Sequence, residues 1–166
     1  MNRHFTATAF VIDSKQRVLL LWHKRLGRWM PPGGHLNENE TPEDAAKREC
    51  KEETNLDVEI IGSVTDGGEP EPDLFILNPQ EGHMLKRPIA MLLENIPESK
   101  ERGEPAHQHM DFLYLARPLN ETDAKELAPD ESDGMRWFMR EDILNLDEQT
   151  EIFSNVKAYI LGILKP

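Results

Sequence analysis

One predicted helix constrains the fold of this 166-residue chain more than any other feature, because both of its ends can be assigned to individual residues. Thr41 is a good N-cap, Pro42 suits the first helical position, and Asp44 takes the place of the capping-box acid. Asn55 tolerates a left-handed backbone, so it is an acceptable residue just after the helix. Because no helix breaker lies between these ends, the sequence predicts a helix over residues 42–54.

Three glutamates of this helix share one face. Glu49, Glu52 and Glu53 stand at positions i, i+3 and i+4, which places their carboxylates within an arc of about 100°. Three like charges on one stripe are unfavourable in a bare helix. Either the stripe is solvated, or a cation lies against it. Mg²⁺ and Mn²⁺ are hard cations that prefer such oxygen ligands and bridge them to phosphates.

The surroundings of the stripe favour a bound cation. Arg48 is spaced to pair with Glu52 at i+4 or to hold a neighbouring acid. The Pro-Pro-Gly-Gly run at residues 31–34 is expected to be a loop whose backbone carbonyls can approach a metal or a phosphate. A face of small side chains would let the helix pack closely; it consists of Ala45, Ala46 and Cys50.

Composition narrows the class of partner. The net charge is −12, from 31 acidic and 19 basic residues, which is opposite to the basic footprint that nucleic-acid binding needs. An acidic surface also repels a free phosphate anion, and a divalent metal held by clustered carboxylates would remove that obstacle. We therefore expect a small phosphate-bearing substrate and no nucleic acid.

Size and hydrophobic pattern predict a single soluble domain over residues 1–166. The longest apolar run, residues 18–22, is far too short to span a membrane, and the N-terminus has no apolar signal-peptide core. The single cysteine, Cys50, cannot form an internal disulfide, as is typical of a reducing compartment. We therefore expect no membrane association and a cytoplasmic location.

Strand-like segments precede, interrupt and follow the predicted helices, which indicates a mixed sheet packed between helices. A turn at residues 13–16 predicts that the first two strands form a hairpin. A helical turn is expected after residue 140, and apolar spacing predicts a helix over residues 148–164. The strands are expected at residues 6–12, 18–23, 56–64, 74–77, 89–94, 110–116 and 135–139.

The 23 residues 34–56 resemble the signature of the Nudix hydrolases, G-x5-E-x7-R-E-U-x-E-E-x-G-U, where U is aliphatic. Two positions depart from it: Cys50 replaces an aliphatic residue, and Asn55 replaces the final glycine. Both changes are mild, since a free cysteine behaves as a small hydrophobe and asparagine tolerates the left-handed turn. The matching positions are Gly34, Glu40, Arg48, Glu49, Glu52, Glu53 and Leu56.

The resemblance implies an α/β fold, the family's α/β/α sandwich around a mixed β-sheet, and a Mg²⁺ site in which Mn²⁺ could substitute. Glu49, Glu52 and Glu53 would bind the metal, and the carbonyl of Gly34 could be a backbone ligand. Arg48 would orient the glutamates. Glu40 would support the loop or a water on the metal.

The implied reaction is attack of an activated water on one phosphorus of a diphosphate. Members of the family differ over which acid acts as the general base. Here it would be a helix glutamate, Glu52 or Glu53, or an acid of a later loop. Glu131 is the loop candidate, with Asp130 and Asp133 as rivals, and ordinary solvated surface is the alternative for that loop.

Two further groups of residues are candidates for binding substrate. Arg25 and Arg28 could contact phosphates, although surface bases are more often simply solvated. His107, His109 and Asp111 alternate along a predicted strand, so their side chains should share one sheet face. They could bind a second metal, contact substrate or supply a proton, or they could be ordinary strand-end residues.

These observations predict a hydrolase that cleaves a phosphoanhydride bond in a nucleoside diphosphate linked to another group. The alternatives are a pyrophosphatase that removes damaged nucleoside triphosphates and a ligand sensor that keeps the fold without catalysis. Residues 65–86 are a candidate specificity element or homodimer contact, and an idle insertion is equally consistent with them.

Overall fold

The computed structural model describes residues 2–61, 80–83, 85–101, 103–120 and 134–164. Its strands form a five-stranded mixed sheet and a smaller three-stranded antiparallel sheet. In the larger sheet β1 and β7 pair in parallel over nine residue positions, and the other pairings are antiparallel. The larger sheet has the order β4 (Gly33–His35), β1 (Arg3–Val11), β7 (His107–Pro118) and β5 (Val58–Ile60), with β6 (Ala90–Ile96) also paired to β7; the smaller has the order β3 (Arg28–Met30), β2 (Val18–His23) and β8 (Met135–Phe138).

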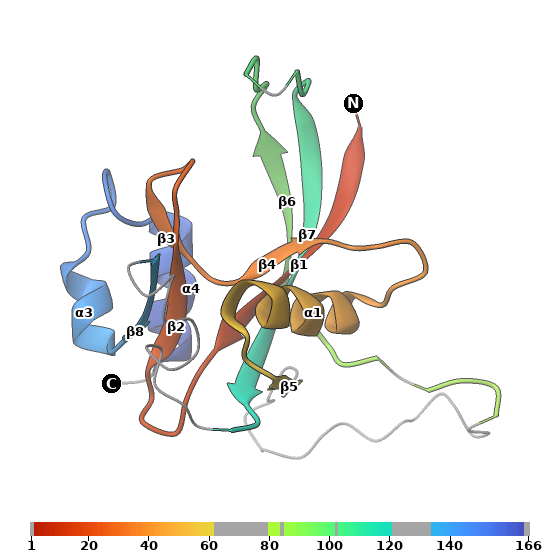
Figure 1. The fold of residues 1–166 in the computed structure, drawn as a ribbon, viewed down its shortest axis with the longest axis horizontal. Helices are drawn as coiled ribbons and strands as arrows, with labels where there is room; N and C mark the ends of the chain where they lie inside the picture. Colours follow the sequence, from red (N-terminus) through yellow and green to blue (C-terminus); the bar gives the residue numbers. More distant parts are fainter. Residues whose placement is uncertain (1, 62–79, 84, 102, 121–133, 165–166) are drawn as a thin grey trace.

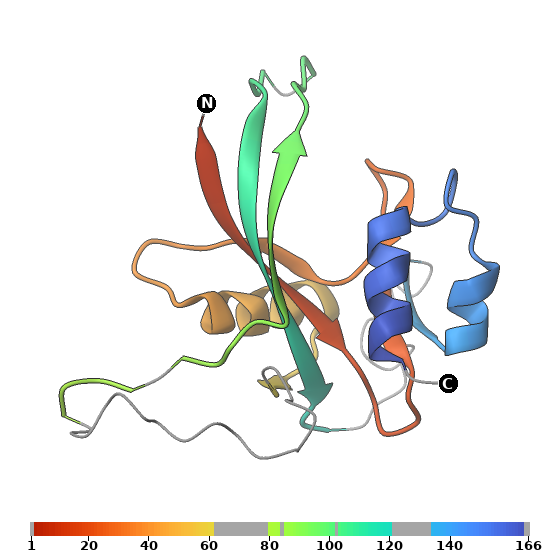
Figure 2. The ribbon, with the colours of Figure 1, turned by 180° about the vertical axis from the view of Figure 1, so that it is seen from behind.

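Within the described residues, three helices pack against these sheets: α1 (Pro42–Thr54), α3 (Arg140–Asn145) and α4 (Ser154–Ile163). Figure 1 shows α1 lying in front of β1 and just below β4, with α3, α4 and the smaller sheet gathered on the left of the molecule. Figure 2, seen from behind, shows β1, β7 and β6 passing in front of α1. This mixed sheet with helices on both sides confirms the predicted α/β fold class.

Side-chain alternation along β1 separates two hydrophobic clusters. Ala7 and Ala9 belong to the cluster that contains Ala45 and Cys50 of α1. Phe10 points to the opposite face and packs in a second cluster with residues of β2, β8 and α4. The small side chains let α1 lie close to the sheet, as the sequence predicted. This packing positions the glutamates of α1 beside the edge strand β4.

The predicted hairpin of the first two strands is wrong. β1 pairs with β4 and β7, whereas β2 pairs with β3 and β8, and only an isolated bridge, Ile12 to Val18, joins the two strands. The turn itself is well formed, because the carboxylate of Asp13 accepts hydrogen bonds from the backbone N–H groups of Lys15 and Arg17. The turn residues therefore correctly predicted a change of chain direction. They did not predict the strand partners of β1, which is buried on both faces and pairs with β4 and β7 instead of β2.

The expected loop at residues 31–34 is also wrong in part, because Gly33 and Gly34 begin strand β4. The glycines permit an unusually close approach rather than preventing a strand. A Cβ atom added at Gly33 would lie 2.6 Å from the backbone oxygen of Ala7 on β1. Only glycine fits so close to the neighbouring strand.

The other predicted elements agree with the structure, with shifted ends. The helix over residues 42–54 is confirmed, whereas α4 begins at Ser154 rather than at residue 148, since Asp147 holds a turn through the N–H groups of Gln149 and Thr150. The predicted strand at residues 74–77, and most of the polar loop after β7, lie outside the described residues. Among the described helices, none combines the length and apolar composition needed to cross a membrane.

Candidate active site

Helix α1 begins and ends at the residues that the sequence indicated. Thr41 accepts a hydrogen bond from the N–H of Asp44 through its hydroxyl oxygen, and the same hydroxyl donates to the Asp44 carboxylate at 2.7 Å. At the other end Asn55 adopts φ 59°, the left-handed conformation, and its N–H donates to the carbonyl of Lys51. Asparagine therefore performs the turn that the signature assigns to glycine. The caps fix the length and rotation of the helix that carries the glutamates.

Arg48 lies at the centre of the acidic groups. Its guanidinium donates two hydrogen bonds to Glu40, at 2.8 and 2.9 Å, and it also contacts Glu49 at 2.7 Å and Glu52 at 3.1 Å. A fifth hydrogen bond, to the carbonyl oxygen of His35, joins the helix to the end of β4. The hydrogen bonds that Arg48 donates to Glu40 lower the pKa of Glu40, and those that it donates to Glu40 and Glu49 raise the pKa of Arg48. The planar fork of Arg48 thus fixes the loop and the first glutamate relative to each other.

Gly34 and Gly33 bring the backbone of β4 against the glutamates. A Cβ atom at Gly34 would lie 2.5 Å from the carboxylate of Glu49, so any side chain at this position would displace that carboxylate. The N–H of Gly33 donates to the carboxylate of Glu53 at 3.0 Å. Two of the three glutamates are therefore held at the strand, while Glu52 is the most exposed of the acids that Arg48 contacts.

The environment of Glu53 perturbs its carboxyl group. Burial of the carboxyl end raises the pKa of Glu53 to about 7, against a lowering by the Gly33 N–H and with a further rise from the charges of Glu49 and Glu52. A carboxyl group so placed accepts a proton readily near neutral pH. The same crowding of negative charge makes the cluster a favourable place for a cation.

The residues present fit a hard divalent cation. Carboxylate oxygens are the ligands that Mg²⁺ prefers, and three carboxylates of α1 gather beside the β4 backbone. Glu49, Glu52, Glu53 and the Gly34 carbonyl would hold such an ion. When bound, it would offset the negative charge of a phosphate and lower the pKa of a water molecule.

Cys50 replaces an aliphatic residue within this helix and is fully buried. Its Sγ lies 3.6 Å from the hydroxyl of Thr54, on the side of α1 that faces the sheet. Burial raises the pKa of the Cys50 thiol to about 11. The thiol is therefore protonated and serves as a small packing group, as the sequence predicted.

His107 and His109 lie on β7, on the sheet face opposite to α1, together with Asp111. The alternation that the sequence predicted is confirmed, but Asp111 is occupied by two threonines of β1: Thr6 donates to one carboxylate oxygen at 3.0 Å and Thr8 to the other at 2.9 Å. Burial raises the pKa of Asp111, and these hydrogen bonds act against the rise. Asp111 therefore links β7 to β1.

The histidines have two neighbours that the sequence reasoning missed, His4 on β1 and His35 on β4. Burial lowers the pKa of His109 to about 4, with additional lowering from His35, His107 and His4. The signal that could have found His4 is the pairing of its strand with β7, which cannot be read from local sequence. The histidines are assembled from three strands.

The remaining predicted site residues have no hydrogen bond to the glutamates of α1 within the described part of the chain. Arg28 is held by the segment before α4, where its guanidinium donates to the carbonyl oxygens of Gln149 and Thr150. Arg25 is exposed in the turn that follows β2. Glu131, with its rivals Asp130 and Asp133, lies outside the described residues. The binding roles of Arg25, Arg28, His107 and His109 stay predictions.

Comparison with known proteins gives the family. The NUDIX domain family model matches residues 2–158. The crystal structure of a NUDIX-family hydrolase from Clostridium perfringens has a TM-score of 0.70 at 31% identity, over 99% of this chain and 97% of that one. The crystal structure of a UDP-X diphosphatase, at 12% identity and a TM-score of 0.52, shares the fold over 63% of its own chain. The chain belongs to the Nudix hydrolase family.

Curated relatives match mainly over part of their length. The RNA pyrophosphohydrolase of Marinomonas sp. is 47% identical over 31% of this chain and 35% of its own length. The oxidized purine nucleoside triphosphate hydrolase of Mus musculus is 45% identical over 34% of this chain and 38% of its own length. The match to the probable DHNTP pyrophosphohydrolase of Lactococcus lactis extends further, with 27% identity over 93% of this chain and 71% of that protein.

Proposed function

We propose that this protein is a Mg²⁺-dependent hydrolase that cleaves a phosphoanhydride bond in a nucleoside diphosphate linked to a second group. The observation that carries the proposal is the convergence of Glu49 and Glu53 on the β4 backbone at Gly33 and Gly34. Glu52 joins this group through Arg48, which contacts both Glu49 and Glu52. Membership of the Nudix hydrolase family supports acid-anhydride chemistry at this place.

The residues would divide the work as follows. Glu53, held by the Gly33 N–H, accepts the proton of the attacking water, for which its raised pKa suits it. The water oxygen bonds to phosphorus, and the bond from that phosphorus to the bridging oxygen breaks. Arg48 and Glu40 keep the loop and the helix in register throughout. Glu131 stays the alternative general base.

A nucleoside triphosphate substrate is the second candidate, and the names of two relatives favour it. The Lactococcus lactis relative is a probable DHNTP pyrophosphohydrolase, and the Mus musculus relative acts on oxidized purine nucleoside triphosphates. Hydrolysis of a triphosphate would release a nucleoside monophosphate and pyrophosphate. Hydrolysis of a linked diphosphate would release two phosphorylated products with no pyrophosphate.

The Mg²⁺ cofactor and a cytoplasmic location belong to the same proposal. The all-oxygen ligand set supports Mg²⁺, with Mn²⁺ as a substitute. The single cysteine supports a reducing compartment. A homodimer contact through residues 65–86 stays a prediction that falls largely outside the described residues.

The test is a hydrolysis screen with Mg²⁺ in ¹⁸O-labelled water, covering nucleotide sugars, dinucleotides, ADP-ribose, and normal and oxidised nucleoside triphosphates. Mass spectrometry of the products identifies both the substrate and the phosphorus that was attacked. Glu53→Gln is the control, and activity must be lost in it. Turnover of triphosphates alone would favour the second candidate. Absence of turnover in a folded protein that binds Mg²⁺ would instead support the ligand-sensor alternative.

A further inference from the structure

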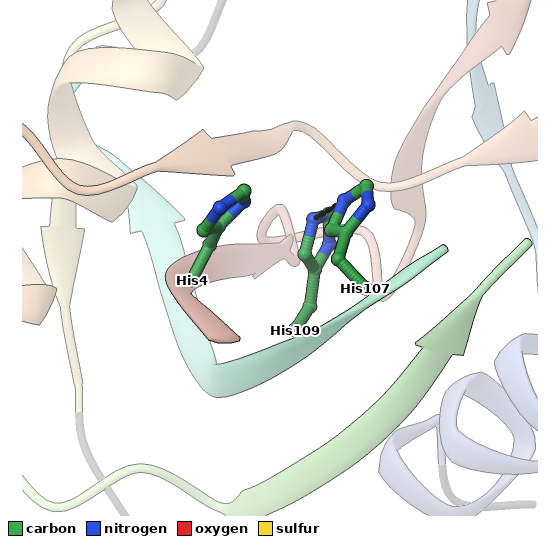
Figure 3. A group of neighbouring side chains, drawn as sticks. All are labelled: His4, His107 and His109. Carbon is green, nitrogen blue, oxygen red and sulfur yellow. Dashed lines mark hydrogen bonds between the residues drawn. The ribbon is translucent and has the colours of Figure 1, made fainter. Parts of the chain in front are cut away.

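Three histidines from two strands converge on the sheet face opposite to α1. In the parallel register of β1 and β7, His4 is directly opposite His109, and His107 lies two residues before His109 on the same face. Figure 3 shows the three imidazole rings pointing to the same side of β1 and β7. Their ligating nitrogens all lie within 4.8 Å of one another. We call His4, His107 and His109 the histidine cluster.

The spacing of the rings matches what a tetrahedral metal would require. A zinc–nitrogen distance of about 2.0–2.1 Å places two ligand nitrogens roughly 3.3 Å apart and their ring centroids roughly 5 Å apart. The Nε2 atoms of His107 and His109 are 3.1 Å apart. Ring centroids are 4.9 Å apart for His4 and His107, 5.0 Å for His107 and His109, and 6.0 Å for His4 and His109. Small rotations of exposed His4 would bring all three nitrogens onto one ion.

His107 is already oriented as a ligand. Its Nδ1 lies 2.9 Å from the carbonyl oxygen of Pro105. Because a carbonyl can only accept, Nδ1 carries the proton, and the lone pair is on Nε2, which faces His109. Metal-binding histidines are fixed in this way by an outer hydrogen bond to a carbonyl or carboxylate. His107 is also buried, so this orientation is maintained by its surroundings.

The cluster is open to solvent on one side and has a fourth imidazole beside it. A surface hollow of about 490 Å³ is lined by His4, His35 and four neighbouring residues of β1 and the segment after β4. The ring centroid of His35 is 5.3 Å from that of His4 and 4.8 Å from that of His109. An ion could therefore reach the cluster from the hollow. Its fourth position would be available to His35 or to water.

We propose that the histidine cluster binds a divalent transition metal of the zinc type, at a site separate from the glutamates of α1. Imidazole nitrogens suit Zn²⁺, Ni²⁺ and Cu²⁺, whereas carboxylate oxygens suit Mg²⁺. Strand β4 separates the two sites. A Cβ at Gly34 would point to Glu49 and one at Gly33 to Thr8, on opposite faces of the sheet. Asp111 is not a ligand here, because Thr6 and Thr8 occupy its oxygens.

The test is titration of the untagged, chelator-treated protein with Co²⁺, followed by visible absorption and then by displacement with Zn²⁺, all in excess Mg²⁺. Mg²⁺ occupies the carboxylates, so the Co²⁺ signal reports nitrogen ligands. We expect one equivalent of Co²⁺ to bind, and His4→Ala and His109→Ala to raise its Kd by about 10-fold or more. His4 is exposed, so His4→Ala should keep the fold, which circular dichroism verifies.

The matched control is Glu52→Gln, which alters the glutamates of α1 and leaves the histidines in place. Co²⁺ binding that persists in Glu52→Gln and weakens in the histidine variants supports the site. Absence of Co²⁺ binding in the wild type overturns the proposal. Equal binding in wild type and His4→Ala, or equal weakening by the glutamate and histidine variants, also overturns it.

Discussion

The glutamates of α1 and the histidine cluster are two groups of proposed metal ligands on opposite faces of one sheet. The three glutamates lie within five consecutive residues of one helix, whereas His4 and His107 are separated by more than one hundred positions along the chain. Arg48 contacts two of the glutamates and the supporting Glu40. The histidines instead contact one another.

The two groups differ in what brings their side chains together. Helix periodicity alone places Glu49, Glu52 and Glu53 together, and it acts over a few residues. The histidine cluster depends on the parallel register of β1 with β7, which the whole sheet determines. The first group is a property of one segment, and the second is a property of the fold.

The largest expected effect is on kcat, and it distinguishes the glutamates of α1 from acidic residues that are only solvated. Glu53→Gln should lower kcat by about 10³-fold or more, because the variant loses both a metal ligand and a proton acceptor. Steady-state kinetics on the substrate found in the screen measures it. Glu59→Gln is the matched control, since Glu59 is an exposed glutamate of β5 paired with Arg117. Wild-type turnover in Glu53→Gln would show that the glutamates of α1 are not the reactive site.

Gly34→Ala tests whether the close approach of β4 matters. The added Cβ would lie 2.5 Å from the Glu49 carboxylate, which must move aside, so turnover should fall at least about 10-fold while stability changes by less than about 1 kcal/mol. Gly162→Ala is the control, because nothing lies within 4 Å of its added Cβ and α4 should gain slightly in helix propensity. Urea unfolding and kinetics compare the two. Equal behaviour of both variants would contradict the packing argument.

Arg48→Lys tests how much the hydrogen bonds between Arg48 and the surrounding acidic residues stabilise the protein. In the histidine cluster the side chains contact one another instead. Lysine keeps the charge but cannot reproduce the two hydrogen bonds to Glu40, so a loss of about 1–2 kcal/mol of stability is expected. Lys47→Gln, which breaks an exposed pair with Asp44, should change stability by less than about 0.5 kcal/mol. The two midpoints in urea decide the matter. Similar losses would mean that Arg48 is no more than a surface charge.

The smallest effect concerns the pKa of Glu53 in the metal-free protein. That pKa is raised from 4.5 to about 7 on folding, so the folded state binds the proton more tightly. The stabilisation is complete below pH 4.5 and is lost as the pH rises through about 7. With a chelator present, wild type should lose about 1 kcal/mol relative to Glu53→Gln between about pH 5 and pH 8. A difference that does not vary with pH would contradict the assignment.

Local signals predicted the parts of the fold that local physics controls. The capped helix, its left-handed Asn55 and the turn at Asp13 all depend on contacts within a few residues. The hairpin prediction failed because strand partners are chosen by burial on both faces, which a turn does not reveal. Strand β4 was missed because Gly33 lies against the backbone of Ala7, a residue distant in sequence. His4 was missed because it approaches His109 only through the pairing of β1 with β7, two strands that are distant in sequence.

The fully buried Cys50 can report the movement of α1 away from the sheet. With its pKa raised to about 11 and its Sγ packed against the sheet, the thiol can react with an alkylating reagent only while α1 is lifted from β1. Because the chain has a single cysteine, the rate of labelling measures the opening of this helix without any engineered probe. A ligand that bridges the glutamates of α1 and strand β4 would slow the labelling of Cys50. The decrease in rate would measure how strongly the ligand holds α1 against the sheet.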